Sequence, residues 1–187
     1  MTGLETAIIL IAFVTVAAVF GYAILSAGLF SAERDKETLY AGLSEAKSNV
    51  EISGSVIARS EDNTNVRWLV FTLKNAVAGN PIDLTPCNGS DNATNNCVIS
   101  LITSGSNISN AKWTKQDVGA TDGDNLLETG EQFEITIDVT DLGDGNSLSD
   151  NLTANDIFTI QVNPSIGASA AIQRTLPPQI DRYMDLH

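Results

Sequence analysis

The opening segment, residues 1–30, constrains the fold of this 187-residue chain more than any other part. Between Gly3 and Phe30 the only charged side chain is Glu5, and the run is long enough to cross a bilayer as a helix. Ile8–Ile11 are four consecutive apolar residues, which point in four directions around a helix. Such a helix has no solvent-facing side, so we expect it to lie in lipid or to be enclosed by protein.

This apolar run has two interpretations. A cleaved signal peptide is disfavoured because the run is too long and no Lys or Arg precedes it. A permanent helix would be either a lipid anchor or the core of an assembly. Small residues recur four positions apart, which allows helix backbones to approach closely and favours an assembly, although Ala and Gly are also common in membrane helices. These pairs are Ala17 and Gly21, Ala23 and Ala27, Ala27 and Ser31, and Gly28 and Ala32.

The helix is expected to continue beyond the apolar run. Residues 31–49 become polar, contain no Pro, and carry a narrow apolar stripe that includes Leu39 and Leu43. We therefore predict one N-terminal helix over residues 1–49, with 1–30 as a hydrophobic core or membrane segment and 31–49 as an amphipathic stem. Residues 50–187 have the length of one outer domain.

From residue 50 onward, apolar residues alternate with polar ones. The clearest alternation is Gln132–Thr140, and Val66–Lys74 is the segment richest in β-branched and aromatic residues. A strand is also predicted from residue 50 to 59, with a bulge at Gly54. The other predicted strands are Cys97–Thr103, Asn110–Gln116, Asp156–Val162 and Ala168–Thr175. About seven short strands with turns between them predict an antiparallel, Ig-like β-sandwich, and hence an α+β chain.

The charge of the chain excludes some partners. The formal net charge is -13, from 10 Lys and Arg against 23 Asp and Glu, which argues against nucleic acid as a ligand. One acidic segment alternates Asp with Gly in a predicted loop, as oxygen cages for Ca²⁺ or Mg²⁺ do. Its candidate ligands are Asp117, Asp122, Asp124 and Glu128. A plain acidic turn is the alternative.

Two further patterns fit an exported protein. Cys87 and Cys97 flank a short loop of small and polar residues, which predicts a local disulfide, with free thiols as the alternative. Four Asn-x-Ser/Thr sequons lie in turn-like stretches and predict N-linked glycans. They begin at Asn88, Asn92, Asn107 and Asn151.

Nothing in the sequence favours catalysis. The only histidine is the last residue, His187, where order is least expected, so a Ser-His-Asp or Cys-His arrangement has no positioned base. The sequence has no P-loop, and Gly143 lies between strands, as a turn glycine does. We therefore predict a protein that is not an enzyme and needs no organic cofactor.

The segment TGLETAIILIAFVTVAAVF, its continuation to Asn49 and the strand that follows resemble the N-terminal region of archaellins, the archaeal flagellins. DGDNLLETGEQFEITI is similar to a segment of their outer domains. The resemblance implies a type IV pilin-like subunit that waits in the membrane and is inserted into an extracellular filament by an assembly ATPase and its platform. It also implies a cleaved basic leader, so the sequence, which shows none, is expected to be the mature form. Glu5 matches the acidic position that pairs with a neighbour's amino terminus in type IV pilins.

The first functional hypothesis is therefore a subunit of the archaeal flagellum (archaellum) that polymerises through its N-terminal helix for swimming, alone or with sister archaellins. Residues 4–30 include 15 large apolar side chains, whose burial among identical helices would contribute roughly 30 kcal/mol before entropic costs. The alternatives are an adhesive archaeal type IV pilin on the same plan, or a membrane-anchored extracellular binding domain that remains monomeric.

Overall fold

The computed structural model describes residues 3–77, 79–86, 96–143, 147–148 and 151–187. The chain divides into two compact units, Met1–Leu43 and Ser44–His187. The first unit is helical, and the second, the strand domain, contains every strand that the structure describes.

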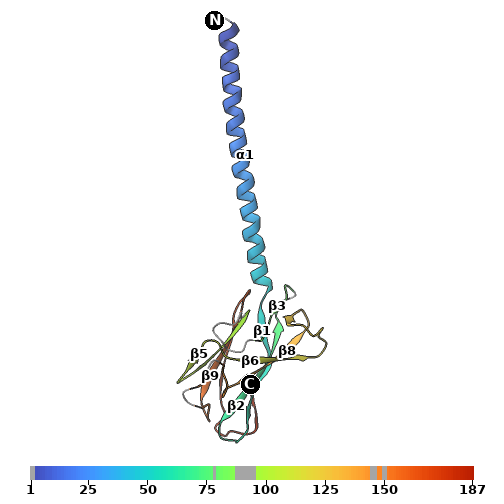
Figure 1. Cartoon of the computed structure of the whole chain (residues 1–187), viewed down its shortest axis with the longest axis vertical. Coiled ribbons are helices and arrows are strands. Elements are labelled where there is room, and N and C mark those ends of the chain that lie inside the picture. Colours follow the sequence, from blue (N-terminus) through green and yellow to red (C-terminus); the bar gives the residue numbers. More distant parts are fainter. Residues whose placement is uncertain (1–2, 78, 87–95, 144–146, 149–150) are drawn as a thin grey trace. The chain divides into compact units, whose positions relative to one another are not determined.

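The helix α1 extends over Gly3–Lys47 without interruption (Figure 1). Its 45 residues correspond to a length of roughly 70 Å. This confirms the predicted long N-terminal helix, which ends two residues before the predicted limit. By length and composition, Gly3–Ser44 could cross a membrane.

The larger sheet of the strand domain has five antiparallel strands in the order β11-β1-β2-β8-β6. Strand β1 is therefore hydrogen-bonded on both sides, to β2 and to the C-terminal strand. The strands are β1 (Val50–Ser60), β2 (Val66–Asn75), β6 (Trp113–Val118), β8 (Gln132–Asp138) and β11 (Tyr183–Leu186).

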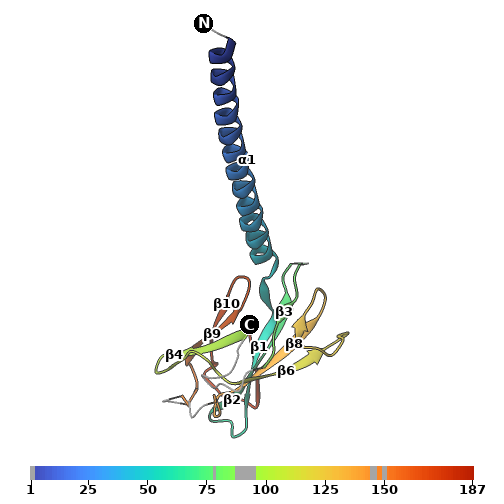
Figure 2. The same cartoon turned by 45° about the horizontal axis from the view of Figure 1, so that its top comes forward.

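A second antiparallel sheet has four strands in the order β10-β9-β4-β5, and a two-stranded ribbon joins β3 to β7. Figure 2 shows β4, β9 and β10 together, apart from the strands of the larger sheet. The strands are β3 (Ile82–Asp83), β4 (Cys97–Thr103), β5 (Asn107–Ile108), β7 (Leu126–Leu127), β9 (Ile157–Pro164) and β10 (Ala170–Thr175).

Both large sheets bury alternate side chains in one hydrophobic core, as a half-buried strand with a period of two requires. Phe71, Trp113 and Phe133 come from the five-stranded sheet, whereas Leu101 and Phe158 come from the four-stranded one. All five are at most 1% exposed. The predicted antiparallel sandwich is thus confirmed.

The predicted bulge in the first strand is also present. The pairing of β1 with β2 shifts register between Ser53 and Ile57. Gly54 lies in this interval with φ +79. This conformation is energetically unfavourable for every residue that has a Cβ, but not for glycine. The glycine therefore allows the strand to bend while both halves keep their apolar residues on the core side.

The residues between α1 and β1 are held by two loops of the strand domain. Ser48 is 1% exposed, and the backbone N–H of Ala168 donates to Oδ1 of Asn49 at 3.0 Å. The N–H of Ala76 donates to the carbonyl of Asn49 at 2.8 Å. Gly167 approaches so closely that a Cβ built there would lie 1.3 Å from the carbonyl oxygen of Ser48. This junction is therefore fixed to the strand domain by packing and hydrogen bonds.

Candidate functional site

The surface of α1 is the largest unpartnered apolar surface of the described residues. Its large side chains, from Leu4 to Phe30, are 54–76% exposed. Soluble monomers rarely expose contiguous apolar patches above a few hundred Å², and larger patches indicate protein or membrane contacts. The helix by itself is therefore incomplete, and it requires a lipid or protein environment.

The predicted helix-packing residues lie within this exposed helix. Ala17, Gly21, Ala23, Ala27 and Gly28 are all exposed. A Cβ added at Gly21 or Gly28 would meet no heavy atom within 4 Å, so nothing within one described chain requires glycine there. Glu5 lies in the first turn of α1, where a carboxylate interacts favourably with the helix dipole. The role of these residues in packing against other copies stays a prediction.

Lys115 of β6 lies two residues before the acidic segment that contains the candidate metal ligands. Its side chain is 11% exposed, and its ammonium is 2.9 Å from Oδ1 of Asp117. The same ammonium donates to the backbone carbonyl of Asp124 and lies 4.0 Å from the ring centroid of Phe133. A lysine of the chain therefore supplies the positive charge that a cation would have brought to this segment.

Asp122, Asp124 and the nearby Glu131 accept backbone hydrogen bonds. Oδ1 of Asp122 accepts the N–H of Asp124 at 3.2 Å, and Oδ1 of Asp124 accepts the N–H of Leu126 at 2.8 Å. The buried carboxylate of Glu131 accepts the N–H of Asp122 at 3.3 Å and that of Glu128 at 3.1 Å. These bonds connect the carboxylates to the backbone of the loop itself.

The prediction of a Ca²⁺ or Mg²⁺ site at Asp117, Asp122, Asp124 and Glu128 therefore finds no support. No group of three or more His, Cys, Asp or Glu side chains within the described ranges is arranged to hold a metal ion. Three of the four candidates have other partners: Asp117 is paired with Lys115, and Asp122 and Asp124 accept backbone amides. The metal site and the plain acidic turn both stay predictions.

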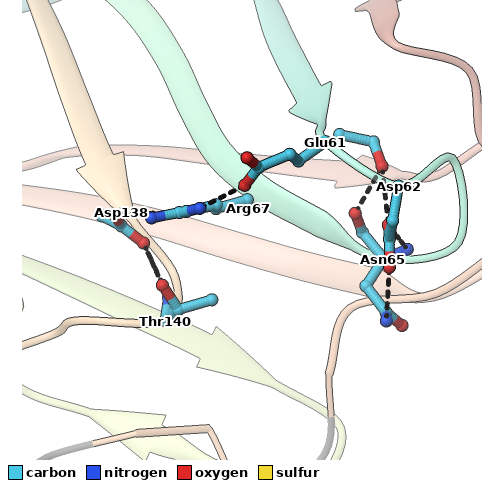
Figure 3. A network of polar contacts seen from close by, with 7 residues as sticks. Glu61, Asp62, Asn65, Arg67, Asp138 and Thr140 are labelled. Carbon is cyan, nitrogen blue, oxygen red and sulfur yellow. Dashed lines mark hydrogen bonds and ion pairs between the residues drawn. The ribbon is translucent and has the colours of Figure 1, made fainter.

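A polar network lies at the turn between β1 and β2 (Figure 3). Oδ1 of Asp62 accepts the N–H of Thr64 at 2.9 Å and that of Asn65 at 3.0 Å. These backbone N–H groups, with that of Asn65 first, hold the pKa of the Asp62 carboxyl below its ordinary value of 3.8. Ser60 adds a hydrogen bond from its hydroxyl at 3.2 Å.

Arg67 lies between two carboxylates of the same network (Figure 3). It donates to Glu61, and this hydrogen bond raises the pKa of the guanidinium above its ordinary value. Nε of Arg67 is 3.7 Å from Oδ2 of Asp138, too far for a hydrogen bond, whereas Oδ1 of Asp138 accepts from Thr140. A cleft of about 450 Å³ adjoins this network and is also lined by Asn151.

The structure locates two of the four predicted glycosylation sites. Asn107 in β5 and Asn151 are both exposed, so a glycan could reach either side chain. Asn88 and Asn92 lie outside the described residues, as does Cys87. Cys97 is buried at the start of β4. The disulfide and the glycans therefore stay predictions.

Sequence reasoning missed a row of side chains across the open face of the larger sheet. The register places Arg59 beside both Tyr183 and Trp68. The guanidinium carbon of Arg59 lies 5.2 Å from each ring centroid, within the range of cation–π attraction. The sequence predicted the strands of Arg59 and Trp68, but the short strand of Tyr183 carries too weak an alternation to reveal the third member.

Comparisons with known proteins match nearly the whole chain to archaeal flagellins. A family model described as archaeal-type flagellin matches residues 1–174. Probable flagellin 1 of Archaeoglobus fulgidus is 38% identical over 204 residues, which cover 99% of this chain and 93% of that protein.

Solved structures of archaeal flagellins are also similar to this chain. A chain in the archaeal flagellum of Methanospirillum hungatei strain JF1 superposes with a TM-score of 0.65 at 27% identity, covering 100% of this chain and 99% of that one. The crystal structure of flagellin FlaB1 from Methanocaldococcus jannaschii matches with a TM-score of 0.57 at 14% identity. That match covers 73% of this chain and 95% of that one, and at this identity it shows a shared fold alone.

Proposed function

Because this chain belongs to the archaeal-type flagellin family, we infer that its exposed apolar helix is the surface through which it polymerises. The chain is a structural subunit of the archaeal flagellum, a filament for motility.

The exposure of α1 is the observation that supports this proposal most strongly. Its 15 large apolar side chains between Leu4 and Phe30 would contribute roughly 30 kcal/mol on burial, before the entropic cost of association. Copies of the same helix can provide this burial in water, whereas a bilayer provides it before assembly. The subunit thus exchanges lipid contacts for contacts with other subunits, and the filament it forms is extracellular.

The partners follow from this exchange. Subunits held in a membrane need an energy source to move into a filament, and the proposed source is an assembly ATPase acting through a membrane platform. Sister archaellins with a similar helix could enter the same filament. The proposed role is structural and not enzymatic, with N-linked glycans at the exposed Asn107 and Asn151 as modifications of the strand domain.

Electron microscopy and mass spectrometry of filaments sheared from cells test the proposal. We expect this chain to be a main protein of the filaments, and deletion of its gene to abolish swimming. Filaments from wild-type cells that lack this chain would contradict the proposal.

A matched pair of substitutions tests close packing of the helices. Ala17 has Gly21 four positions away, whereas neighbouring Ala18 has Val14 and Tyr22 at that spacing. Ala17→Leu should therefore prevent close approach of helix backbones and reduce filament yield, and Ala18→Leu should leave assembly near normal. Both changes add the same side-chain volume, so equal yields would argue against packing through the small-residue pairs.

Mass spectrometry of the isolated subunit tests the proposed disulfide between Cys87 and Cys97. Reduction should add the mass of two hydrogens to the native protein. The native protein should not react with a thiol-alkylating reagent before reduction, and alkylation of both cysteines at that stage would rule the disulfide out.

A further inference from the structure

One corner of the five-stranded sheet presents a cation between two aromatic rings on its open face. Arg59 of β1 is paired in register with Tyr183 of β11 on one side and with Trp68 of β2 on the other. Its guanidinium carbon is 5.2 Å from both ring centroids. Tyr183 is 61% exposed, and Arg59 and Trp68 are half-buried, so this aromatic corner (Arg59, Trp68 and Tyr183) is accessible.

Arg59 forms no ion pair in the described chain, a property it shares with Arg174 and Arg182 but not with four other cations of the strand domain. Arg67, Lys74, Lys112 and Lys115 each lie within 4.0 Å of a carboxylate, whereas Arg59 has no such partner among the residues the structure describes. Acidic residues outnumber basic ones by 23 to 10 in the chain. A guanidinium in these surroundings is expected to attract a carboxylate from another molecule, because charge-assisted hydrogen bonds to Arg are strong.

Apolar surface adjoins this cation. Ile57, two residues before Arg59 on the same face of β1, is 38% exposed. Trp, Tyr and Arg are the residue types enriched where protein interfaces carry most of their binding energy, with apolar contacts at the centre and charges at the rim. The aromatic corner therefore has the composition of a protein-binding surface for an acidic, partly apolar segment.

A segment with this chemistry lies at the diagonally opposite corner of the same sheet. Strand β6 is the edge strand opposite β11, and Val118 at its end pairs with Gln132. Trp68, in contrast, pairs with Asp138 at the other end of β8. The acidic loop, residues 118–128, begins at Val118. It exposes two large apolar side chains, at 39% and 37%, together with three acidic ones: Val118, Leu126, Asp122, Asp124 and Glu128.

We propose that the aromatic corner of one subunit binds the acidic loop of a second copy of this chain. The two surfaces differ and occupy opposite corners, so neither can satisfy the other within one subunit. A contact between different surfaces repeats from copy to copy without closing, and this is the arrangement that generates filaments. The inference rests on the filament role, to which it adds a contact between strand domains besides the packing of helices.

Crosslinking of filaments formed by an Arg59→Lys variant tests this contact. The change keeps the positive charge and supplies an amine, which a carbodiimide joins directly to a carboxylate in contact with it. We expect a covalent subunit dimer in which the peptide containing position 59 is joined to the acidic loop at Asp122, Asp124 or Glu128. Dissociating the filaments in detergent before crosslinking should reduce this product by on the order of tenfold or more, because effective concentration is lost.

The chain provides its own control for the reagent. Nζ of Lys112 lies 2.5 Å from Oδ2 of Asp141, so these residues should be joined within every subunit. If that link forms in intact filaments while position 59 stays unlinked or joins another segment, the inference is overturned and the filament role stands. If the wild-type chain forms no filaments, the proposed function itself fails.

Charge reversal provides a second readout that does not depend on crosslinking. Arg59→Glu should lower the temperature at which filaments dissociate by more than it lowers the unfolding temperature of dissociated subunits, which lose only the cation–π contacts to Trp68 and Tyr183. Arg182→Glu is the matched control, because exposed Arg182 borders the aromatic corner next to Tyr183 and belongs to no ion pair in the described chain, but is in cation–π contact with neither ring. Equal dissociation temperatures for the two variants would count against the proposed contact.

Discussion

Replacement of Gly167 by alanine tests the junction between α1 and β1 at its closest contact. The added Cβ would lie 1.3 Å from the carbonyl oxygen of Ser48 and 2.5 Å from its carbonyl carbon. Ordinary contacts begin at 3.4 Å, so these backbone atoms would have to separate by about 2 Å. Neither atom belongs to a flexible side chain, and the strand domain must therefore deform at this point.

The energetic cost has two parts. A residue with a Cβ at φ +103 costs roughly 1–2 kcal/mol. Separation of the two segments also breaks the hydrogen bond from Ala168 to Asn49 and strains the one from Ala76, at about 1 kcal/mol each. We therefore expect Gly167→Ala to lower the free energy of unfolding by about 3–4 kcal/mol.

Urea unfolding of a fragment containing residues 44–187, the compact strand domain, measures this effect. Gly119→Ala is the matched control, because Gly119 has φ +84 but a Cβ there would meet no atom within 4 Å. The control should lose only the conformational part, roughly 1–2 kcal/mol. Equal losses in the two variants would refute the reasoning that the close approach to Ser48 is what requires glycine.

Three further changes test the strand domain, each by urea unfolding of the same fragment. Phe71→Ala should cost about 3–5 kcal/mol, because it empties a fully buried position between the two sheets; a loss below 1 kcal/mol would contradict that packing. Lys115→Met should cost about 1–3 kcal/mol, since it leaves the Asp117 carboxylate and the Asp124 carbonyl without their donor, and wild-type stability would show that the ammonium is dispensable. The lowered pKa of Asp62 stabilises the fold above the unfolded value of 3.8, and this stabilisation is lost as the pH falls through the folded value. Asp62→Asn keeps the hydrogen-bond acceptor but cannot titrate, so its stability should fall less than that of wild type between about pH 5 and pH 2; identical pH profiles would refute this assignment.

Features with a strong period in the sequence were predicted accurately. The uninterrupted apolar run predicted α1. The alternation in Gln132–Thr140 predicted β8, whose apolar residues Phe133, Ile135 and Ile137 are buried as expected. The bulge at Gly54 was predicted because glycine interrupts the alternation of its strand. For β8 and the bulge, the local pattern and the tertiary packing require the same conformation, whereas the local pattern alone is enough to predict α1.

Features that depend on partners distant in sequence were not predicted. Strands β3, β5 and β7 have two residues each, too few to show alternation, and β11 forms because its backbone pairs with β1. The sequence of the acidic segment suggests a metal site because it does not reveal the contact between Lys115 and the Asp124 carbonyl. That contact depends on how the loop folds. The aromatic corner likewise exists only when three strands align in register.

The direct passage of the chain from α1 into β1 has a mechanical consequence for a filament that must transmit force. Tension carried by the backbone reaches the five-stranded sheet at Val50, the first residue of β1. Antiparallel hydrogen bonds run perpendicular to their strands, so pulling β1 along its own direction loads its bonds to β2 and β11 in shear, many at once. The strand domain should therefore resist unfolding under tension more strongly than it would if the helix led into an edge strand. The hydrogen bonds of an edge strand can break one after another.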